Sequence, residues 1–497
     1  MESLELEKLQ LVPDDEVRET NTISSRGKRD LLVEQLKKVT QMAAPMVVVS
    51  VSQYLVQVVS LMMSGHLGEL SLSGVAIATS FTNVTGFALL FGLSGALETL
   101  CGQAYGAEQY KKCGTYTYCS IISLLPVCIP VSILWRFMDD LLVSIGQDPE
   151  ISRVAAQYAV NLIPALFGDA VLQPLNRYMQ SQGRTLPMLL SAVAALCGHV
   201  PICWAMVYKF GLENVGAALA VGLAYWFNAV LLILYVRWAS SCEKTRGMCW
   251  NDFGPSVREF WRFAVPSAVM VCLEWWTFEL LVLLAGLLPD ATLQSSVLSI
   301  CVTTTSLHYY VQYGIGAAAS TGVSNELGAG NPDKAKAVIQ SAVGISTLEA
   351  IIVSTTLFYC RGFFGYVFSN DEAVVAYVAD VAPLLCLSVV VDSFLAVLSG
   401  TCGDAGVARG SGWQHIGAYY GVGMPVAVLM CFVLHLGGKG LWVGILTAST
   451  LQAVLLAFIT AFTNWDRQAE KARARIFDGG SCSGQGSTTE VEVKLIQ

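Results

Sequence analysis

The sequence is poor in charge. Only 13% of its 497 residues are Asp, Glu, Lys or Arg, whereas soluble proteins carry about 25%. Apolar residues make up 54% of the chain, and the mean hydropathy is +0.57. This balance predicts an all-α protein that crosses a membrane many times, with the lipid bilayer as its surroundings. No long basic run and no zinc-finger spacing occurs, which argues against nucleic acid as a partner.

Motifs of soluble enzymes and metal sites are also missing. No P-loop, HExxH or EF-hand pattern is present, and the GxSG of "FGLSGAL" follows an apolar helix rather than a strand. Many of the 15 cysteines lie within apolar segments, where a free thiol behaves as a small hydrophobic group. We therefore expect no metal, no cofactor and no catalytic residues. A multi-pass membrane enzyme would need a cluster of His, Asp or Glu at one membrane face, and none is visible.

Long apolar runs are what the sequence does contain. A helix that crosses a bilayer needs about 20 largely apolar residues. Twelve stretches qualify: 43–63, 72–97, 117–137, 154–176, 187–209, 215–238, 263–288, 295–319, 337–360, 374–399, 413–436 and 440–463. The ends of the chain, 1–34 and 466–497, are polar and are predicted to be disordered tails.

The distribution of Lys and Arg predicts the orientation. With the N-terminus inside, the inner loops hold 12 basic residues, and the outer ends and loops hold 5. Because cytoplasmic loops carry an excess of Lys and Arg, both termini are predicted to be cytosolic. Residues 241–262 are then the longest inner loop.

The two halves of the chain resemble each other. Pro45 in "AAPMVVV" recurs as Pro266 in "AVPSAVM", and "TLCGQAYGA" recurs as "TGVSNELGA" at almost the same separation. "YAVNLIP" recurs as "YVADVAP", again at nearly that separation. Each half, 35–240 and 263–465, therefore has six spans and the same orientation. Paired lobes of this kind are typical of transporters that work by alternating access around a central site, and a receptor or a structural protein has no comparable need for them. The lack of a filter-like repeat argues against a channel.

Two carboxylates interrupt the apolar spans of the second half. Glu274 and Asp392 stand where the repeat places Gln53 and Gln173 in the first half. A charge at the centre of a bilayer costs about 2.5–3.5 kcal/mol on insertion scales, and an apolar site favours the neutral form of a carboxyl group. Such a group is suited to exchanging a proton, so we predict a proton-coupled carrier whose ion chemistry is confined to the second half.

Further residues are candidates for the substrate cavity. Glu279 lies five residues after Glu274, about 140° round the helix, and Asp169 lies one helical turn before Gln173. Trp275, Tyr309 and Tyr313 present ring faces that attract organic cations.

Other polar residues of the spans are expected to have structural roles. Glu98, Glu349 and Asp380 lie near predicted span ends, where exposure is expected. His199 and His308 are expected to be packed or hydrogen-bonded.

The strings "LETLCGQAYGA", "CLEWWTFE", "VSNELGAGNP" and "GKGLWVG" resemble those of multidrug and toxic compound extrusion (MATE) transporters, most of all the plant DETOXIFICATION branch. The resemblance covers about residues 35–465. It implies two six-helix bundles arranged as a V, and export of organic cations, xenobiotics or secondary metabolites in exchange for protons. It also implies that Glu274 and Asp392 are the coupling carboxylates and that Glu279 matches a second family Glu.

The same resemblance implies a carrier of the plasma or vacuolar membrane, which we expect to act as a monomer driven by a proton gradient. The chain departs from the family pattern at Gly322, where Arg is usual, and at the additional "TCGDAG" of 401–406. A sodium-coupled exporter or a lipid-linked flippase of related fold is the alternative. A flippase should need a more basic cavity than the acidic one expected here.

Overall fold

The computed structural model describes residues 14–285, 288, 290–368, 371–404 and 414–478. Eleven helical segments among them are long and apolar enough to cross a membrane, and helix α11 (Ala291–Gly328) is the twelfth. The predicted all-α architecture with twelve spans is therefore confirmed.

The first half of the chain supplies six spans. The second span consists of four consecutive short segments, one of which, η1 (Asn83–Phe87), is a π-helical turn. In order, the elements are α1 (Asp14–Gly65), α2 (Glu69–Thr82), η1 (Asn83–Phe87), α3 (Ala88–Ser94), α4 (Ala96–Gly106), α5 (Tyr110–Arg136), the short α6 (Met138–Ser144), α7 (Pro149–Ser181), α8 (Thr185–Trp204) with η2 (Ala205–Lys209), and α9 (Glu213–Trp238).

The second half repeats this arrangement after two short 3₁₀ turns, η3 (Ser240–Cys242) and η4 (Trp250–Asp252). Its elements are α10 (Phe253–Ala285), α11, α12 (Pro332–Phe364) with η5 (Gly365–Val367), α13 (Glu372–Asp404), η7 (Ile416–Gly423), α15 (Met424–Val428), η8 (Leu429–Val433), α16 (Gly438–Phe462) and α17 (Trp465–Asp478).

Helix α11 lies between the two halves of the chain and has many polar residues in its middle. Its middle reads "TTTSLHYYVQY", and it packs against α1, α4, α10, α12 and α13. Neighbouring helices therefore cover much of its surface, and its polar side chains face protein rather than lipid.

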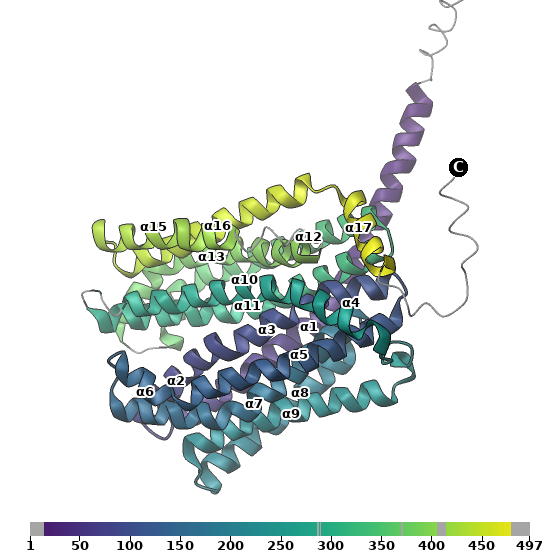
Figure 1. The fold of residues 1–497 in the computed structure, drawn as a ribbon. Coiled ribbons are helices and arrows are strands. Elements are labelled where there is room, and N and C mark those ends of the chain that lie inside the picture. Colours follow the sequence, from purple (N-terminus) through teal and green to yellow (C-terminus); the bar gives the residue numbers. More distant parts are fainter. Residues whose placement is uncertain (1–13, 286–287, 289, 369–370, 405–413, 479–497) are drawn as a thin grey trace, which may run out of the picture.

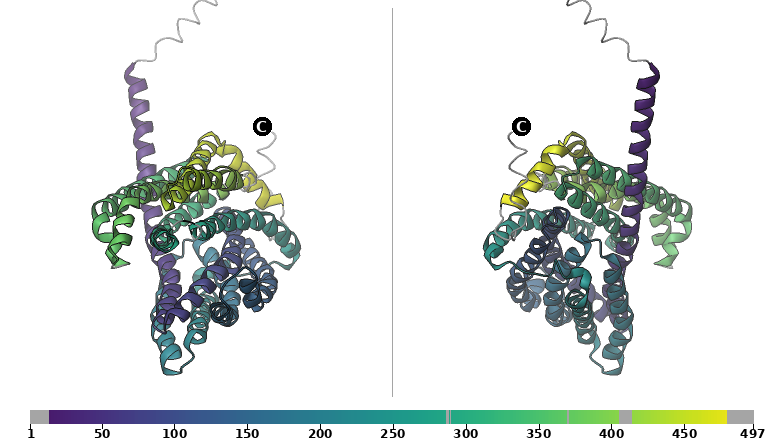
Figure 2. Two further views of the ribbon diagram at one scale, coloured as in Figure 1. Left: turned by 90° about the vertical axis from the view of Figure 1, so that its left-hand side faces the viewer. Right: turned by 90° about the vertical axis from the view of Figure 1, so that its right-hand side faces the viewer.

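The helices form two bundles, one from each half of the chain (Figure 1). The views along the helices separate the blue first half from the green and yellow second half (Figure 2). The bundles meet along two equivalent contacts, α1 with α11 and α10 with α3. The core is shared as well, since Met46 of α1 packs in the core of the second bundle and Ala264 of α10 packs in that of the first.

The repeat is visible at the level of single contacts. A Cβ atom added to Gly92 would lie 2.6 Å from the Cα atom of Ala268, and one added to Gly314 would lie 2.6 Å from the backbone nitrogen of Val47. The separation between the two glycines along the chain is almost the same as that between their two partners. The halves are therefore related by a pseudo-two-fold axis, as the internal repeat predicts.

The bundles approach most closely where α4 and α11 end, which we call the crossing end. A Cβ atom added to Gly106 would lie 1.9 Å from the carbonyl oxygen of Asn325, and one added to Gly328 would lie 2.1 Å from that of Gln103. Only glycine allows two helix backbones to come this close. The crossing end is the end predicted to face the cytosol, and it is closed in this conformation.

Alanine at these two glycines is expected to force the helices apart. We expect Gly106→Ala and Gly328→Ala each to destabilise this conformation by about 1–3 kcal/mol, the range for overpacked sites. Thermal unfolding of the purified protein in detergent would measure the loss. Gly198→Ala is the matched control, because a Cβ atom there meets nothing within 4 Å. Equal unfolding midpoints for all three variants would contradict the close crossing.

Part of the predicted C-terminal tail is helical. The segment 466–497 was expected to be disordered, yet α17 covers Trp465–Asp478. Trp465, Ala469 and Ala472 recur at helical spacing and are buried against α11 and α12. Arg475 donates a 2.8 Å hydrogen bond to Gln103 of the first bundle. An amphipathic stripe of this kind folds when it has a partner surface.

Two other boundaries differ from the prediction. Helix α1 begins at Asp14, inside the segment 1–34 that was expected to be disordered, because propagating a helix outward from a formed span adds one hydrogen bond per residue. Its first part projects beyond the bundles (Figure 2). Helix α10 begins at Phe253 rather than after 262, so the expected loop 241–262 is half helical. Phe260 is fully buried there, which explains the longer helix.

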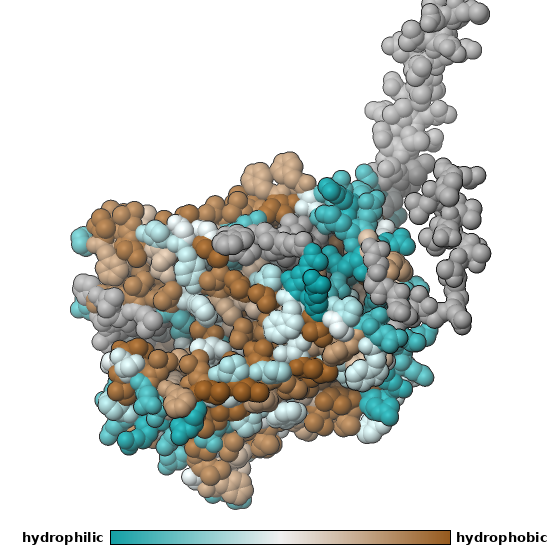
Figure 3. Space-filling view, in the orientation of Figure 1, coloured by the Kyte–Doolittle hydropathy of each residue, from teal (hydrophilic) through white to brown (hydrophobic). Residues whose placement is uncertain are grey.

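The outer surface agrees with a membrane location. Large apolar side chains are exposed along the helices, such as Phe458 and Ile351. Brown, hydrophobic residues cover most of the middle of the face in Figure 3, and hydrophilic residues gather toward the helix ends. In water such a surface would drive aggregation, so it is a lipid-facing surface.

Candidate functional site

A cavity of about 460 Å³ lies between the two bundles. Near the crossing end it is lined by Glu98, Arg177 and Gly316, and towards the other end by Leu61, Thr79 and Thr303. Its volume falls within the range of about 300–1,000 Å³ that is typical of small-molecule sites. The cavity therefore has room for an organic molecule at about the middle of the membrane.

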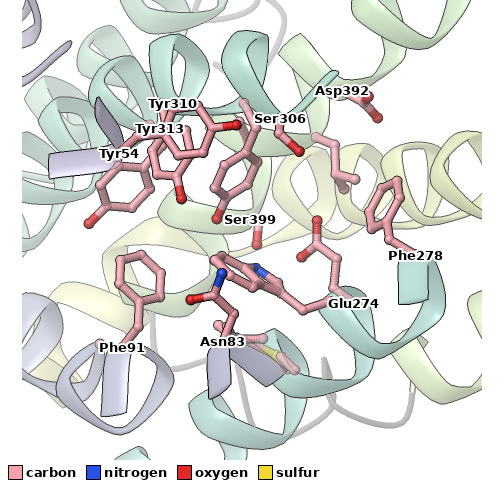
Figure 4. Close-up of a pocket in the computed structure, with 18 of the residues that line it drawn as sticks. Tyr54, Asn83, Phe91, Glu274, Phe278, Ser306, Tyr310, Tyr313, Asp392 and Ser399 are labelled. Carbon is pink, nitrogen blue, oxygen red and sulfur yellow. The ribbon is translucent and has the colours of Figure 1, made fainter. Parts of the chain in front are cut away.

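Glu274 and Asp392 both line this cavity. Glu274 comes from α10 and Asp392 from α13, and the charge of Asp392 acts on Glu274. In Figure 4 the Glu274 carboxylate is directed into the cavity, with Phe278 and Asp392 to one side of it. The two carboxylates that the sequence singled out therefore face one space.

The polar neighbours of these carboxylates come from α16 and η7. Tyr419 and Ser449 line the same cavity as the two carboxylates, and their hydroxyls lie 3.3 Å from each other. No basic side chain within the described residues forms a salt bridge with Glu274 or Asp392. A carboxylate in such a place is stabilised by gaining a proton or by the arrival of a cation.

The predicted aromatic residues form one wall of the cavity. The ring centroids of Trp275 and Tyr309 are 6.4 Å apart in an edge-to-face arrangement, and those of Tyr309 and Tyr313 are 6.2 Å apart and stacked. Tyr54 of α1 stacks on Tyr310 at 4.6 Å, and sequence reasoning had assigned no role to Tyr54. Because aromatic faces attract cations, this wall complements the carboxylates opposite.

The remaining predicted residues are divided between two cavities. Glu279 lines the main cavity, although it lies on a different side of α10 from Glu274. Gln53, Gln173 and Asp169 instead line a neighbouring cavity of about 70 Å³ in the first bundle.

This smaller cavity shares the wall of Trp275, Tyr309 and Tyr313 with the main one. Within it, Gln173 donates a 2.9 Å hydrogen bond to Asp169. The glutamines thus occupy positions in the first bundle like those of the carboxylates in the second, as the repeat predicts. Asp169 does not face the main cavity.

Sequence reasoning missed a buried ion pair at the end of the cavity nearest the crossing end, which we call the cavity floor. Arg177 of α7 pairs with Glu98 of α4, and their side chains are only 3% and 16% exposed. Arg177 also contacts the hydroxyl of Tyr313, and Ser320 donates a 2.9 Å hydrogen bond to Glu98. Tyr313 and Ser320 both belong to α11, so the pair of one bundle is bonded to the other bundle.

Glu98 was predicted to be exposed near a span end, and this prediction is wrong. Its span continues to Gly106, so the residue lies two helical turns inside it. Arg177 lies just beyond the predicted span 154–176, whereas α7 continues to Ser181. The two partners are far apart in sequence, and no local pattern indicates their contact.

Glu349 was also predicted to be exposed, and it is not. It lies in the middle of α12 with its side chain 17% exposed, and its carboxylate is 3.4 Å from the ring of His308. The prediction for Asp380 is confirmed, since its carboxylate is 61% exposed and pairs with Lys439. His199 is hydrogen-bonded as expected, with its ring 3.1 Å from the hydroxyl of Ser60.

No group of three or more His, Cys, Asp and Glu side chains in the described part of the chain is placed to hold a metal ion. The polar groups that line the main cavity are carboxylates, hydroxyls and amides, together with aromatic rings and the guanidinium of Arg177, which is paired with Glu98. These groups suit binding of a cation and transfer of a proton.

Comparison with known proteins agrees with this geometry. The family model MatE matches residues 45–205 and 266–433, two stretches that begin at the repeated prolines. Protein DETOXIFICATION 6 from Arabidopsis thaliana is 55% identical over 458 residues, covering 91% of this chain and 94% of that protein. Protein DETOXIFICATION 3 from the same plant is 55% identical over 448 residues, covering 89% and 93%.

Solved structures show the same fold. The crystal structure of the eukaryotic MATE transporter AtDTX14 superposes with a TM-score of 0.87 at 49% identity, covering 90% of this chain and all of that one. An outward-facing MATE family transporter of the MOP superfamily has a TM-score of 0.78 at 18% identity and covers 89% of this chain. The second match supports the fold alone.

Proposed function

The chain belongs to the MatE family of membrane transporters, and on this basis we propose that it exports organic cations, xenobiotics or secondary metabolites in exchange for protons. Membership makes it a multi-pass membrane protein that carries small molecules across a bilayer. The coupling ion, the substrate class and the side of the membrane on which the termini lie are parts of our proposal.

One observation carries the proposal. Glu274 and Asp392 face a common cavity, and no basic side chain of the described residues forms a salt bridge with either one. An exchanger needs groups that bind a proton or a cationic substrate but not both at once. A carboxylate in a cavity with aromatic walls meets this need, because each ligand neutralises the same charge.

The conformation supports alternating access. The cavity is closed at the crossing end by the contacts of α4 with α11. Opening that end requires the two bundles to move apart there, which would expose the same carboxylates to the other side of the membrane. Protonation from outside and substrate binding from inside would then alternate.

The positive-inside count supports cytosolic termini, and we propose that the crossing end faces the cytosol. We further propose that a single chain is the working unit, because the cavity is built entirely within one chain. The membrane is proposed to be the plasma membrane or the vacuolar membrane.

Uptake into liposomes tests the function. The purified protein would be reconstituted, an inside-acidic pH gradient imposed without sodium, and uptake of a fluorescent organic cation followed. Controls collapse the gradient with a protonophore and clamp the membrane voltage. We expect uptake that depends on the gradient and disappears with it. If uptake requires added sodium, the coupling ion is sodium and not the proton, in agreement with the sodium-coupled alternative.

A further inference from the structure

A cluster of polar side chains lies behind Asp392, inside the second bundle. It consists of Glu349 from α12, His308 and Gln312 from α11, and Ser393 from α13, and we call it the rear cluster. None of the four lines either cavity. Glu349 stands in the middle of a membrane span, where an ionisable group is costly and needs an explanation.

The rear cluster centres on one carboxylate oxygen. Oε2 of Glu349 lies 3.4 Å from Nε2 of His308 and 3.5 Å from the hydroxyl of Ser393, and it accepts a hydrogen bond from the amide of Gln312. The side chain of His308 is only 4% exposed. A buried imidazole and a buried carboxylate in contact are stabilised when they hold one proton between them, as an ion pair or as two neutral groups.

The same imidazole acts on the cavity. Ser393 follows Asp392 directly on α13, and its hydroxyl lies 3.5 Å from Nε2 of His308. A charge on His308 acts on Asp392. The imidazole therefore contacts Glu349 directly and, on the cavity side, Ser393, the residue that follows Asp392 on α13.

The charged groups that line the main cavity on helices packed against α11 or α12 are Asp392, Glu274, Glu279, Glu98 and Arg177. The other charges on α12 and its neighbours are remote from Glu349. On α12 the nearest charged residues are Lys336 and Arg361, roughly 18–20 Å away along the helix at about 1.5 Å per residue. The remaining described charges on α12 and on the helices packed against it lie toward helix ends: Lys28, Arg29, Asp30, Glu34, Lys37, Lys38, Glu326, Asp333, Lys334, Glu372, Asp380, Asp466, Arg467, Glu470, Lys471, Arg473 and Arg475.

We propose that Glu349 holds a proton on His308 and so presents an imidazolium to Asp392 from behind the cavity. Glu349 is then a positioning residue of the coupling site and does not contact the substrate. This inference rests on the proposed function, because it concerns how readily Asp392 exchanges its proton for a cation.

The proposal fixes the sign of the effect. A cation beside Asp392 favours its ionised form. Without Glu349 no carboxylate stabilises the protonated imidazole of His308. The positive charge beside Asp392 is then lost, and Asp392 keeps its proton up to a higher pH. Because a cationic substrate competes with that proton, substrate binding should then require more alkaline conditions.

Binding of ethidium to the purified protein over a pH series tests this inference. We expect the pH of half-maximal binding to rise by about one unit in Glu349→Gln, a tenfold change in proton affinity. His308→Gln should produce a similar rise. The double variant should rise no further than the single ones, because both residues act through the same proton. Asp380→Asn is the control and should leave the midpoint unchanged, because this exposed carboxylate lies on the same helix as Asp392 but does not line the cavity.

Other outcomes overturn the inference. An unchanged midpoint with fewer binding sites or a lower unfolding temperature would make Glu349 a packing residue. A fall in the pH of half-maximal binding would mean that the negative charge of Glu349 acts on Asp392 directly and favours its protonated form. If Glu349→Gln does not fold, the double variant, which leaves no unpaired charge, decides the question.

Failure of the proposed function would show separately in the liposome experiment, as wild-type uptake that does not depend on the pH gradient. Wild-type uptake that follows the gradient, together with an unchanged binding midpoint in Glu349→Gln, overturns only the role of the rear cluster.

Discussion

Uptake driven by a pH gradient is expected to fall to the level of protein-free liposomes when Glu274 is replaced by Gln. The same loss is expected for Asp392→Asn. Each substitution keeps the size of the side chain and removes its ability to ionise, so the cavity is permanently in a state that resembles the protonated one. Both side chains line the 460 Å³ cavity, and the charge of one acts on the other.

The measurement is gradient-driven uptake of a fluorescent cation, with the amount of folded protein in the liposomes held equal. Glu372→Gln is the matched control, since it neutralises an exposed carboxylate at the start of the same helix as Asp392. Full uptake by Glu274→Gln would make Glu274 a packing residue. The search for the coupling group would then move to Asp392, Glu279 and Asp169.

Loss of the floor ion pair is expected to have the second largest effect. We expect Arg177→Met to destabilise the protein by about 3–5 kcal/mol, because it leaves Glu98 buried without its partner. The guanidinium also lies 4.8 Å from the ring centroid of Phe91, and that contact is lost too. Thermal unfolding in detergent would measure the change.

The double variant Arg177→Met/Glu98→Gln separates charge from packing. Since it leaves no unpaired charge, most of the lost stability should return, as is typical when a buried pair is replaced by neutral groups. Equal unfolding midpoints for the single and double variants would show that packing of Arg177, and not its charge, holds the floor together. Lys336→Met, at an exposed pair with Asp333, is the control and should change little.

The most informative sequence signals were absences and repetitions. Low charge predicted the membrane, and the recurrence of Pro45 as Pro266 predicted two matched bundles, which the contacts of Gly92 and Gly314 confirm. Glu274 and Asp392 were recognisable because a carboxylate within an apolar run is rare. These signals depend on neighbouring residues or on regular repeats along the chain, so the sequence alone is enough to recognise them.

The errors share a different cause. Glu98 and Arg177 were placed beyond span ends because the predicted spans 72–97 and 154–176 stop short of the observed helix ends at Gly106 and Ser181. Glu349 was expected to be exposed although the predicted span 337–360 already has this residue in its middle. The structure extends those helices into the protein interior, where each polar side chain has a partner from another helix. No local pattern indicates a partner on another helix that is remote along the chain.

By itself, the sequence determined the class of molecule, the number of spans, the two-fold repeat and the presence of Glu274 and Asp392 within apolar spans of the second half. Hydrophobicity and periodicity control these properties, and both are carried by neighbouring residues. Only the tertiary structure decided which carboxylates share the cavity, that the crossing end is closed by Gly106 and Gly328, and that Arg177 and the rear cluster are buried. These features depend on distances between helices remote in sequence, which are set when the bundles pack against each other.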